Sequence, residues 1–285
     1  MKWYSVLIFL GCLLIGCKNH GQLSYVTKLP KKLDENSGIV TLKDSAIWLI
    51  EDRGNPDKIY NVDFKGNLLK ELKVKNAKNH DWEDLAEDKE GNLYIGDFGN
   101  NSNKRKDLVI YKIPNPEIEK GDKIDAEKIK FSYPDQKDFP PLVAELNYDA
   151  EAFFYHKDFL YVITKNRTIP FSGEAVIYKI PAIPGEHSAK FIGKFIPCKQ
   201  DILCQVTAAD ISQDGSTIAI LGYGKLFLFT DFEWDDFSKG KMKTINLGAT
   251  TQLESVCFLN NDTLLLSDEE RGNTGGNLYT LKLSK

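Results

Sequence analysis

The sequence is poor in cysteine and histidine, with five cysteines and four histidines among 285 residues. These residues form no cluster, which argues against a zinc site. Basic residues are not in excess, because the net charge is −4 and both signs are interspersed, so we expect no nucleic-acid partner. The chain also lacks a Gly-x-Ser-x-Gly turn and a glycine-rich phosphate loop. Neither the serine hydrolases built on that turn nor the phosphate-loop nucleotidases are therefore expected.

Long apolar runs are missing as well. The stretch Trp3–Ile15 is shorter than the roughly 20 residues that a membrane-spanning helix needs. It ends in Leu14-Ile15-Gly16-Cys17, which is the pattern of a bacterial lipoprotein signal. We therefore expect residues 1–16 to be a signal peptide, Cys17 to carry acyl chains such as palmitate, and residues 17–22 to form a tether. Cys12 is a second candidate for lipidation, and a cleaved signal without lipid is the alternative.

The residues after Cys17 bear on which membrane would hold the anchor. They read Lys18-Asn19-His20-Gly21, with no aspartate directly behind the cysteine and no acidic run. The first absence argues against retention in the inner membrane, and the second argues against export to the cell surface. We expect a lipid anchor in the outer membrane, with the protein facing the periplasm.

Three cysteines remain in the rest of the chain. Cys198 and Cys204 lie six residues apart, and an oxidising periplasm would allow them to pair. Cys257 would then be a small buried hydrophobic residue. Three unpaired thiols are the alternative, and the sequence does not decide between the two.

A repeat organises the chain, and no long helical period follows Gly21. In each repeat, polar or acidic residues run into an apolar strand, and a turn, a second strand and a third strand such as Val109–Ile113 follow. Turns such as Glu90-Gly91-Asn92 suit tight β-hairpins. The five repeats start 45 to 68 residues apart, near positions 37, 83, 151, 209 and 254. This pattern predicts an all-β fold, a single β-propeller of four-stranded blades over residues 23–285.

The two ends of the propeller are expected to meet. The fifth repeat stops after its third strand, and an unassigned alternating strand, Leu23–Leu29, stands at the other end of the domain. This N-terminal strand would supply the missing outer strand of the last blade and close the ring. We expect five blades. Six would need a degenerate blade within Phe131–Tyr148, whose three prolines suit strands poorly.

The propeller fold predicts an acidic face. Strands of a blade run antiparallel from the axis outward, so the start of the innermost strand and the end of the second strand share one face. Acidic residues gather at both sets of positions, with arginines and amides around them. We expect a small molecule or an envelope protein to bind there. The expected ligand-binding residues are Glu35, Asp52, Arg53, Asp97, Asn100, Asp149, Arg167, Asp268 and Arg271.

Carboxylates crowded around an axis are unfavourable unless something compensates their charge. Nearby arginines, protonation of some acids, or a bound cation would each do so, and the sequence leaves all three open. Oxygen ligands from several strands suit Ca²⁺, which accepts six to eight of them in irregular geometry. Ca²⁺ is thus the expected cofactor if a cation is bound. Its expected ligands are Glu83, Asp84, Glu151, Asp210 and Glu254.

Two resemblances bear on function. Glu83-Asp84-Leu85, followed by a turn and Gly91–Asp97, resembles the start of a blade in the calcium-dependent propeller hydrolases of the paraoxonase and gluconolactonase groups. That resemblance implies an acidic pair that binds a central metal, which polarises a lactone or ester carbonyl. The segment Glu35–Ile39, with a later acidic pair, is similar to the periplasmic SdiA-regulated propellers. Those hydrolases place asparagines at other innermost-strand starts, where this chain has Glu151, Asp210 and Glu254.

Three functions compete on this evidence. A monomeric binding protein anchored in the envelope is favoured, because the catalytic set of the hydrolases is incomplete. A calcium-dependent lactonase or esterase is the first alternative, with His80 as the general base. A non-catalytic scaffold component of the envelope is the second. Fold alone does not separate them.

Overall fold

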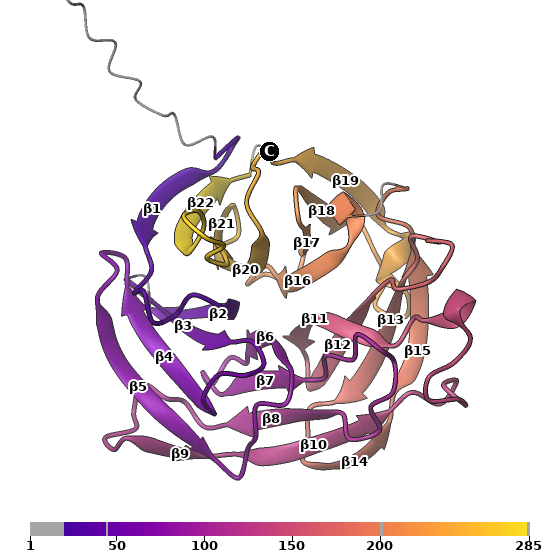
Figure 1. Ribbon diagram of the computed structural model, residues 1–285, viewed down its shortest axis with the longest axis horizontal. Helices are drawn as coiled ribbons and strands as arrows, with labels where there is room; N and C mark the ends of the chain where they lie inside the picture. Colours follow the sequence, from indigo (N-terminus) through magenta and orange to yellow (C-terminus); the bar gives the residue numbers. More distant parts are fainter. Residues whose placement is uncertain (1–19, 44, 200–201, 284–285) are drawn as a thin grey trace, which may run out of the picture.

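Five sheets stand around a central axis in the computed structural model, which describes residues 20–43, 45–199 and 202–283 (Figure 1). The five-bladed propeller fold is therefore confirmed. The innermost strands are β2 (Asn36–Lys43), β6 (Trp82–Glu87), β11 (Asp149–His156), β16 (Val206–Ile211) and β20 (Leu253–Asn260). Each contacts its two neighbours around the ring.

Three further strands complete each blade toward the outside. The second strands are β3 (Ala46–Glu51), β7 (Leu93–Asp97), β12 (Phe159–Lys165), β17 (Ile218–Gly222) and β21 (Thr263–Asp268). The third strands are β4 (Lys58–Asp63), β8 (Val109–Ile113), β13 (Ala175–Pro181), β18 (Lys225–Thr230) and β22 (Asn277–Lys282). The outer strands are β5 (Leu68–Lys75), β10 (Glu127–Ser132), β15 (Lys190–Phe195), β19 (Lys241–Asn246) and β1 (Ser24–Lys28).

The ring closes as the sequence predicts. Strand β1 pairs antiparallel with β22, so the N-terminal strand is the outer strand of the last blade. The six-blade alternative is wrong: between the end of β10 and Tyr148 the described chain forms only one short 3-10 turn, η1 (Val143–Glu145). The prolines of this segment have no backbone N–H to give to a strand ladder.

Two short strands were not expected. Strand β9 (Lys123–Asp125) pairs parallel with β5, and β14 (Gly185–Ser188) pairs parallel with β10. In both cases the link between the third and outer strands of one blade runs along the edge of the preceding blade. Blades 1 to 3 are therefore joined at their outer edges as well as at the axis (Figure 1).

Apolar side chains fill the space between adjacent blades. The five hydrophobic clusters each draw on two neighbouring blades, and large side chains such as Trp48, Trp82 and Phe227 lie fully buried in them. Because a middle strand is covered on both faces, β17 is buried along its whole length. Cys198 and Cys204 form a disulfide with a Cα–Cα distance of 5.4 Å, and Cys257 is a buried free thiol, which decides between the two alternatives that the sequence left open.

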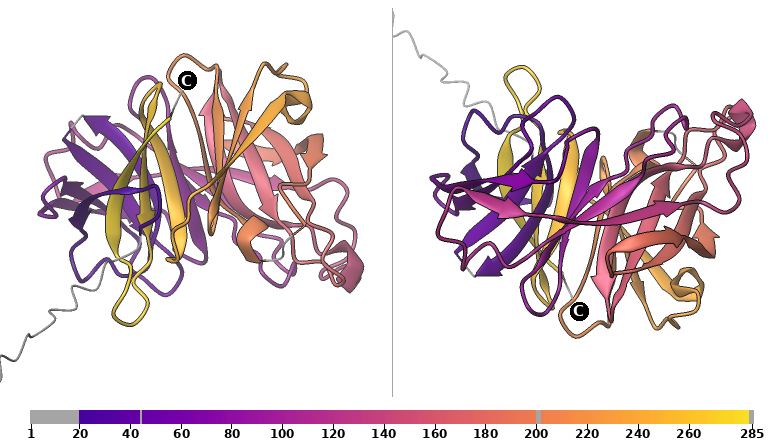
Figure 2. Two further views of the ribbon diagram at one scale, coloured as in Figure 1. Left: turned by 90° about the horizontal axis from the view of Figure 1, so that it is seen from above. Right: turned by 90° about the horizontal axis from the view of Figure 1, so that it is seen from below.

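Loops project from both faces of the ring (Figure 2). We call the upper face the one at which the innermost strands begin and the second strands end, and the lower face the one that carries the turns between these strands. No helix in the described ranges is long and apolar enough to cross a membrane. The predicted signal peptide and Cys17 lie outside the described residues.

Candidate functional site

A β-bulge recurs at the upper end of every innermost strand. In β6, Trp82 pairs with Asp97 and Asp84 pairs with Gly96, which leaves Glu83 as the extra residue. The same shift occurs at Glu151 in β11, at Thr207 in β16 and at Glu254 in β20, and β2 has one extra residue after Asn36. A bulge changes the direction of its side chains, and here it brings three glutamates together at the upper end of the axis.

One part of this acidic ring is neutralised by cations. Glu151 lies 3.1 Å from the Lys165 amine and 2.9 Å from the Arg167 guanidinium. Arg167 also lies 2.6 Å from Asp149, which in addition accepts a hydrogen bond from the backbone N–H of Asn100. Burial raises the pKa of Glu254 to about 8, although the nearby Lys165 charge opposes this shift.

A second group of carboxylates in this ring has few cations nearby. Among the described residues, Asp52, Asp81 and Glu83 form a group whose potential ligand oxygens all lie within 4.8 Å of one another. Asp81 is only 6% exposed, yet its Oδ1 atom has no hydrogen-bond partner. The nearest cation to that atom is Arg53, whose Nε lies 3.8 Å away on a side chain that is 59% exposed. This acidic triad is therefore a partly buried cluster of carboxyl groups with few cationic partners among the described residues.

Burial and mutual repulsion raise the pKa values of the triad. The pKa of Asp52 rises to about 6, chiefly through burial, and the pKa of Asp81 is raised for the same reason. Burial and the Glu151, Asp52 and Asp81 charges hold the pKa of Glu83 well above its ordinary value. A bound cation would reverse these shifts, because it favours the ionised carboxylates.

The chain backbone comes close to the triad at Gly99. A Cβ atom at this position would lie 2.0 Å from Glu83 Oε1 and 2.6 Å from the Asp81 carboxylate. Only glycine therefore fits here while these two carboxylates keep their positions.

Asp84 and Asp210 lie apart from the triad and have structural partners. Asp84 is fully buried, and its carboxylate accepts hydrogen bonds from the backbone N–H groups of Leu85, Phe153 and Ala209. It thereby ties β6 to β11 and β16. The Asp210 carboxylate accepts a bond from the Phe258 N–H at 2.6 Å and ties blade 4 to blade 5.

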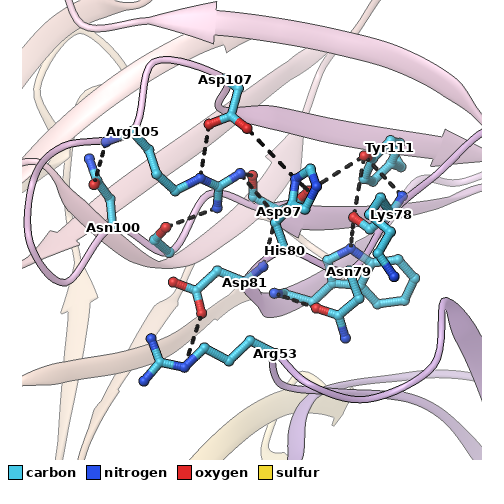
Figure 3. A network of polar contacts seen from close by, with 12 residues as sticks. Arg53, Lys78, Asn79, His80, Asp81, Asp97, Asn100, Arg105, Asp107 and Tyr111 are labelled. Carbon is cyan, nitrogen blue, oxygen red and sulfur yellow. Dashed lines mark hydrogen bonds and ion pairs between the residues drawn. The ribbon is translucent and has the colours of Figure 1, made fainter.

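The predicted base His80 faces other acids than the triad carboxylates, and the backbone N–H of Asp81, which donates to Asp97, links the two groups of acids (Figure 3). Its Nδ1 atom lies 3.6 Å from Asp97 and 3.7 Å from Asp107. Asp97 is also bound by Arg105, 3.2 Å away. In Figure 3 the Asp81 carboxylate points toward Arg53 and away from the His80 ring. His80 instead lines a lateral cleft of about 480 Å³ over blade 2.

Of the remaining predicted ligand-binding residues, some have partners that stabilise the fold and others lie near the surface. Asn100 stabilises the loop after β7, since its Oδ1 accepts a bond from the Arg105 N–H. Asp268 is fully buried and accepts hydrogen bonds from Asn277 N–H and the Tyr279 hydroxyl within blade 5. Glu35 and Arg271 lie nearer the surface, where Glu35 accepts a bond from Asn55 and Arg271 pairs with Glu269.

Three residues of this region were not among the predicted site residues, namely Asp81, Lys165 and Arg105. Asp81 stands two residues before Glu83, and this spacing alone was a signal for a shared site. Lys165 ends β12 beside Asn166 and Arg167, but a lysine at a strand end gives no sign that it will be buried. Arg105 lies in a basic loop and becomes a partner of Asp97 only through folding.

Comparisons with known proteins agree with the fold. No protein-family model matches the chain, and no curated protein sequence matches it. The structure is similar to that of the PQQ-bound form of aldose sugar dehydrogenase from Streptomyces coelicolor, with a TM-score of 0.53 and 11% identity over 92% of this chain and 98% of that one. In all, 604 chains of solved structures match, so the likeness is widely shared. At this identity it shows the β-propeller fold and no function.

Proposed function

We propose that this protein is an envelope lipoprotein whose propeller binds a ligand on its upper face through a Ca²⁺ ion held by Asp52, Asp81 and Glu83. The observation that carries the proposal is the acidic triad itself. Its oxygens lie within 4.8 Å of one another, and no buried cation is paired with Asp81 in the described chain. The neighbouring Glu151 has such a partner in Lys165, and Asp149 pairs with the half-buried Arg167.

The donor set fits calcium. All three side chains offer carboxylate oxygens, which are the ligands that Ca²⁺ prefers, and Ca²⁺ tolerates irregular geometry. Three residues fill only part of a shell of six to eight oxygens. The remaining positions would be open to water or to oxygen atoms of a ligand, which makes the triad suited to binding.

The two alternatives draw less support. A hydrolase would use the same cation, but its base His80 makes its closest acidic contacts with Asp97 and Asp107. A pure scaffold predicts an acidic ring that is neutralised throughout, whereas the triad is not. A binding role needs neither a base nor further residues.

The calcium proposal predicts a metal-dependent melting temperature. At a free Ca²⁺ concentration of 100 times the Kd, a ligand specific for the folded state stabilises it by about 2.7 kcal/mol. For a domain of this size, that corresponds to a rise of about 5–10 °C. Scanning calorimetry of the protein with Ca²⁺ or with chelator measures the shift.

Two variants make this experiment specific. Glu83→Gln removes one ligand and should abolish most of the calcium response. Glu186→Gln, which changes an exposed glutamate on β14, should leave the response intact. A wild-type melting temperature that does not change with millimolar Ca²⁺, or a Glu83→Gln variant with an undiminished response, would contradict the proposal.

The anchor follows from Cys17 and from the direction of β1. Strand β1 begins on the lower face, a few residues after Cys17, so an anchor there would place the lower face toward the membrane and the acidic face away from it. We expect wild-type protein in the membrane fraction and a Cys17→Ala variant that is released or left unprocessed. Metabolic labelling with a palmitate analogue distinguishes the two proteins, and an unlabelled wild type in its native host would refute lipidation.

A further inference from the structure

A second cavity opens at the opposite end of the axis from the acidic triad. It has a volume of about 630 Å³ and lies at the lower face, where the innermost strands end. All five blades contribute to its lining. The residues on which the argument rests are Leu42, Glu87, His156, Asp210, Trp234 and Phe258.

Two acidic side chains from different blades face this cavity. Glu87 ends β6 and Asp210 lies near the end of β16. Glu87 Oε2 is buried without a hydrogen-bond partner in the described chain. Burial and the Asp210 charge hold the pKa of Glu87 well above its ordinary value, and burial raises the pKa of Asp210 to about 7. One oxygen atom of the Glu87 carboxyl group, Oε2, thus has no hydrogen-bond partner among the described residues.

A second unsatisfied atom belongs to His156. Its Nε2 atom is buried without a hydrogen-bond partner, and its ring stacks on Trp234 with centroids 3.7 Å apart and an interplanar angle of 9°. Burial and the nearby lysine charges lower the pKa of His156 to about 4, so the ring is neutral at pH 7. The stacking fixes the imidazole in place as a neutral polar group at the wall of the cavity.

The rest of the cavity wall combines apolar side chains with an excess of acidic residues over lysines. Leu42, Phe258 and Trp234 supply apolar contacts. Five acidic residues and two lysines line the cavity, which disfavours an anion. Glu87 and Asp210 also do not belong to the described group of side chains close enough to share a metal ion. A ligand here needs positive charge, N–H donors and an apolar part.

We propose that this lower cavity is a binding site for a small organic cation, a primary amine or amidine with an apolar substituent. Its N–H groups donate to Glu87 and Asp210, and its apolar part lies against Trp234 and Phe258. Quaternary ammonium ions carry charge but no N–H donor, so they leave the Glu87 acceptor unsatisfied. The site is independent of the calcium site proposed at the upper face.

Titration calorimetry with benzylamine, with benzyl alcohol as an uncharged analogue of similar shape, tests the assignment. We expect one benzylamine per chain, and binding of benzyl alcohol that is weaker by about tenfold or more, since a charged hydrogen bond is lost. Glu87→Gln should weaken benzylamine binding by about tenfold for the same reason. Quenching of Trp234 fluorescence, absent in a Trp234→Phe variant, should report binding at this cavity.

Two control variants keep the outcome decisive. Glu90→Gln alters an exposed acid at the rim and should bind benzylamine as the wild type does. Glu83→Gln should also bind it normally, because Glu83 belongs to the upper face. The proposal is overturned if benzylamine fails to bind at millimolar concentration, if benzyl alcohol binds equally well, or if Glu87→Gln has no effect. Loss of binding in Glu83→Gln would place the amine at the upper face and would overturn it too.

Discussion

Replacing Lys165 by methionine should destabilise the protein by up to about 3–5 kcal/mol, the cost of removing one partner of a buried ion pair, since among the described residues only the half-buried Arg167 would still pair with Glu151. Lys165 is 3% exposed, and its amine lies 3.1 Å from Glu151 and 3.0 Å from the Tyr223 hydroxyl. It also opposes the charge of Glu254. Methionine fills similar volume, so the loss reports the charge and not a cavity. Denaturant unfolding of wild type and variant measures the difference.

A second substitution separates charge from packing. In the double variant Lys165→Met with Glu151→Gln, the carboxylate that lost its lysine is neutral and Arg167 keeps Asp149, so we expect most of the lost stability to return. Lys130→Met is the matched control, because Lys130 and Glu186 form an exposed pair whose loss should cost less than about 1 kcal/mol. A Lys165→Met variant that unfolds like the wild type would show that the acidic ring does not depend on this cation.

The architecture was predictable because it is repeated. Five copies of one strand pattern, each with its own turn signals, specify the same blade five times, so an ambiguous element in one copy is resolved by the others. One of these turns is Asp88-Lys89-Glu90-Gly91. It has a positive φ of 79° at Gly91, which glycine adopts without strain. The last repeat lacked an outer strand, and the unassigned N-terminal strand was the one segment left to supply it.

The acidic site was predictable only in outline. Strand alternation places neighbouring residues on opposite sides, and the bulge at Glu83 decides which of Glu83 and Asp84 faces the other acids. A bulge of this kind has no clear sequence signal when the extra residue is not glycine. Glu83 therefore joins Asp52 and Asp81, whereas Asp84 is held by backbone N–H groups.

The added strands β9 and β14 were hidden for a related reason. Each is short, with three or four residues and largely exposed side chains, so neither carries an apolar pattern of its own. They are held by parallel backbone hydrogen bonds to the edge of the preceding blade. Pairing of this kind depends on where the edge lies in space, and a local pattern cannot reveal it.

Removing β1 should have the largest effect on the fold. A chain that begins at Lys31 loses the outer strand of blade 5 and the buried side chains of Leu23 and Leu29, which are 6% and 3% exposed. Losing a buried leucine side chain typically costs about 2–5 kcal/mol, so two of them rival the 5–15 kcal/mol that stabilises a typical domain. We expect the shortened chain to be largely unfolded or aggregated, because β22 becomes a free edge.

A chain that begins at Gln22 is the matched control, since it keeps β1 and should melt as the full protein does. Adding a peptide of residues 22–30 to the shortened chain should restore part of the lost stability, because the peptide can pair with β22 as β1 does. Circular dichroism melts and size-exclusion chromatography compare the three samples. If the chain that begins at Lys31 stayed monomeric and melted at the control temperature, closure by β1 would contribute little, and the stability of the ring would have to come from the clusters between blades alone.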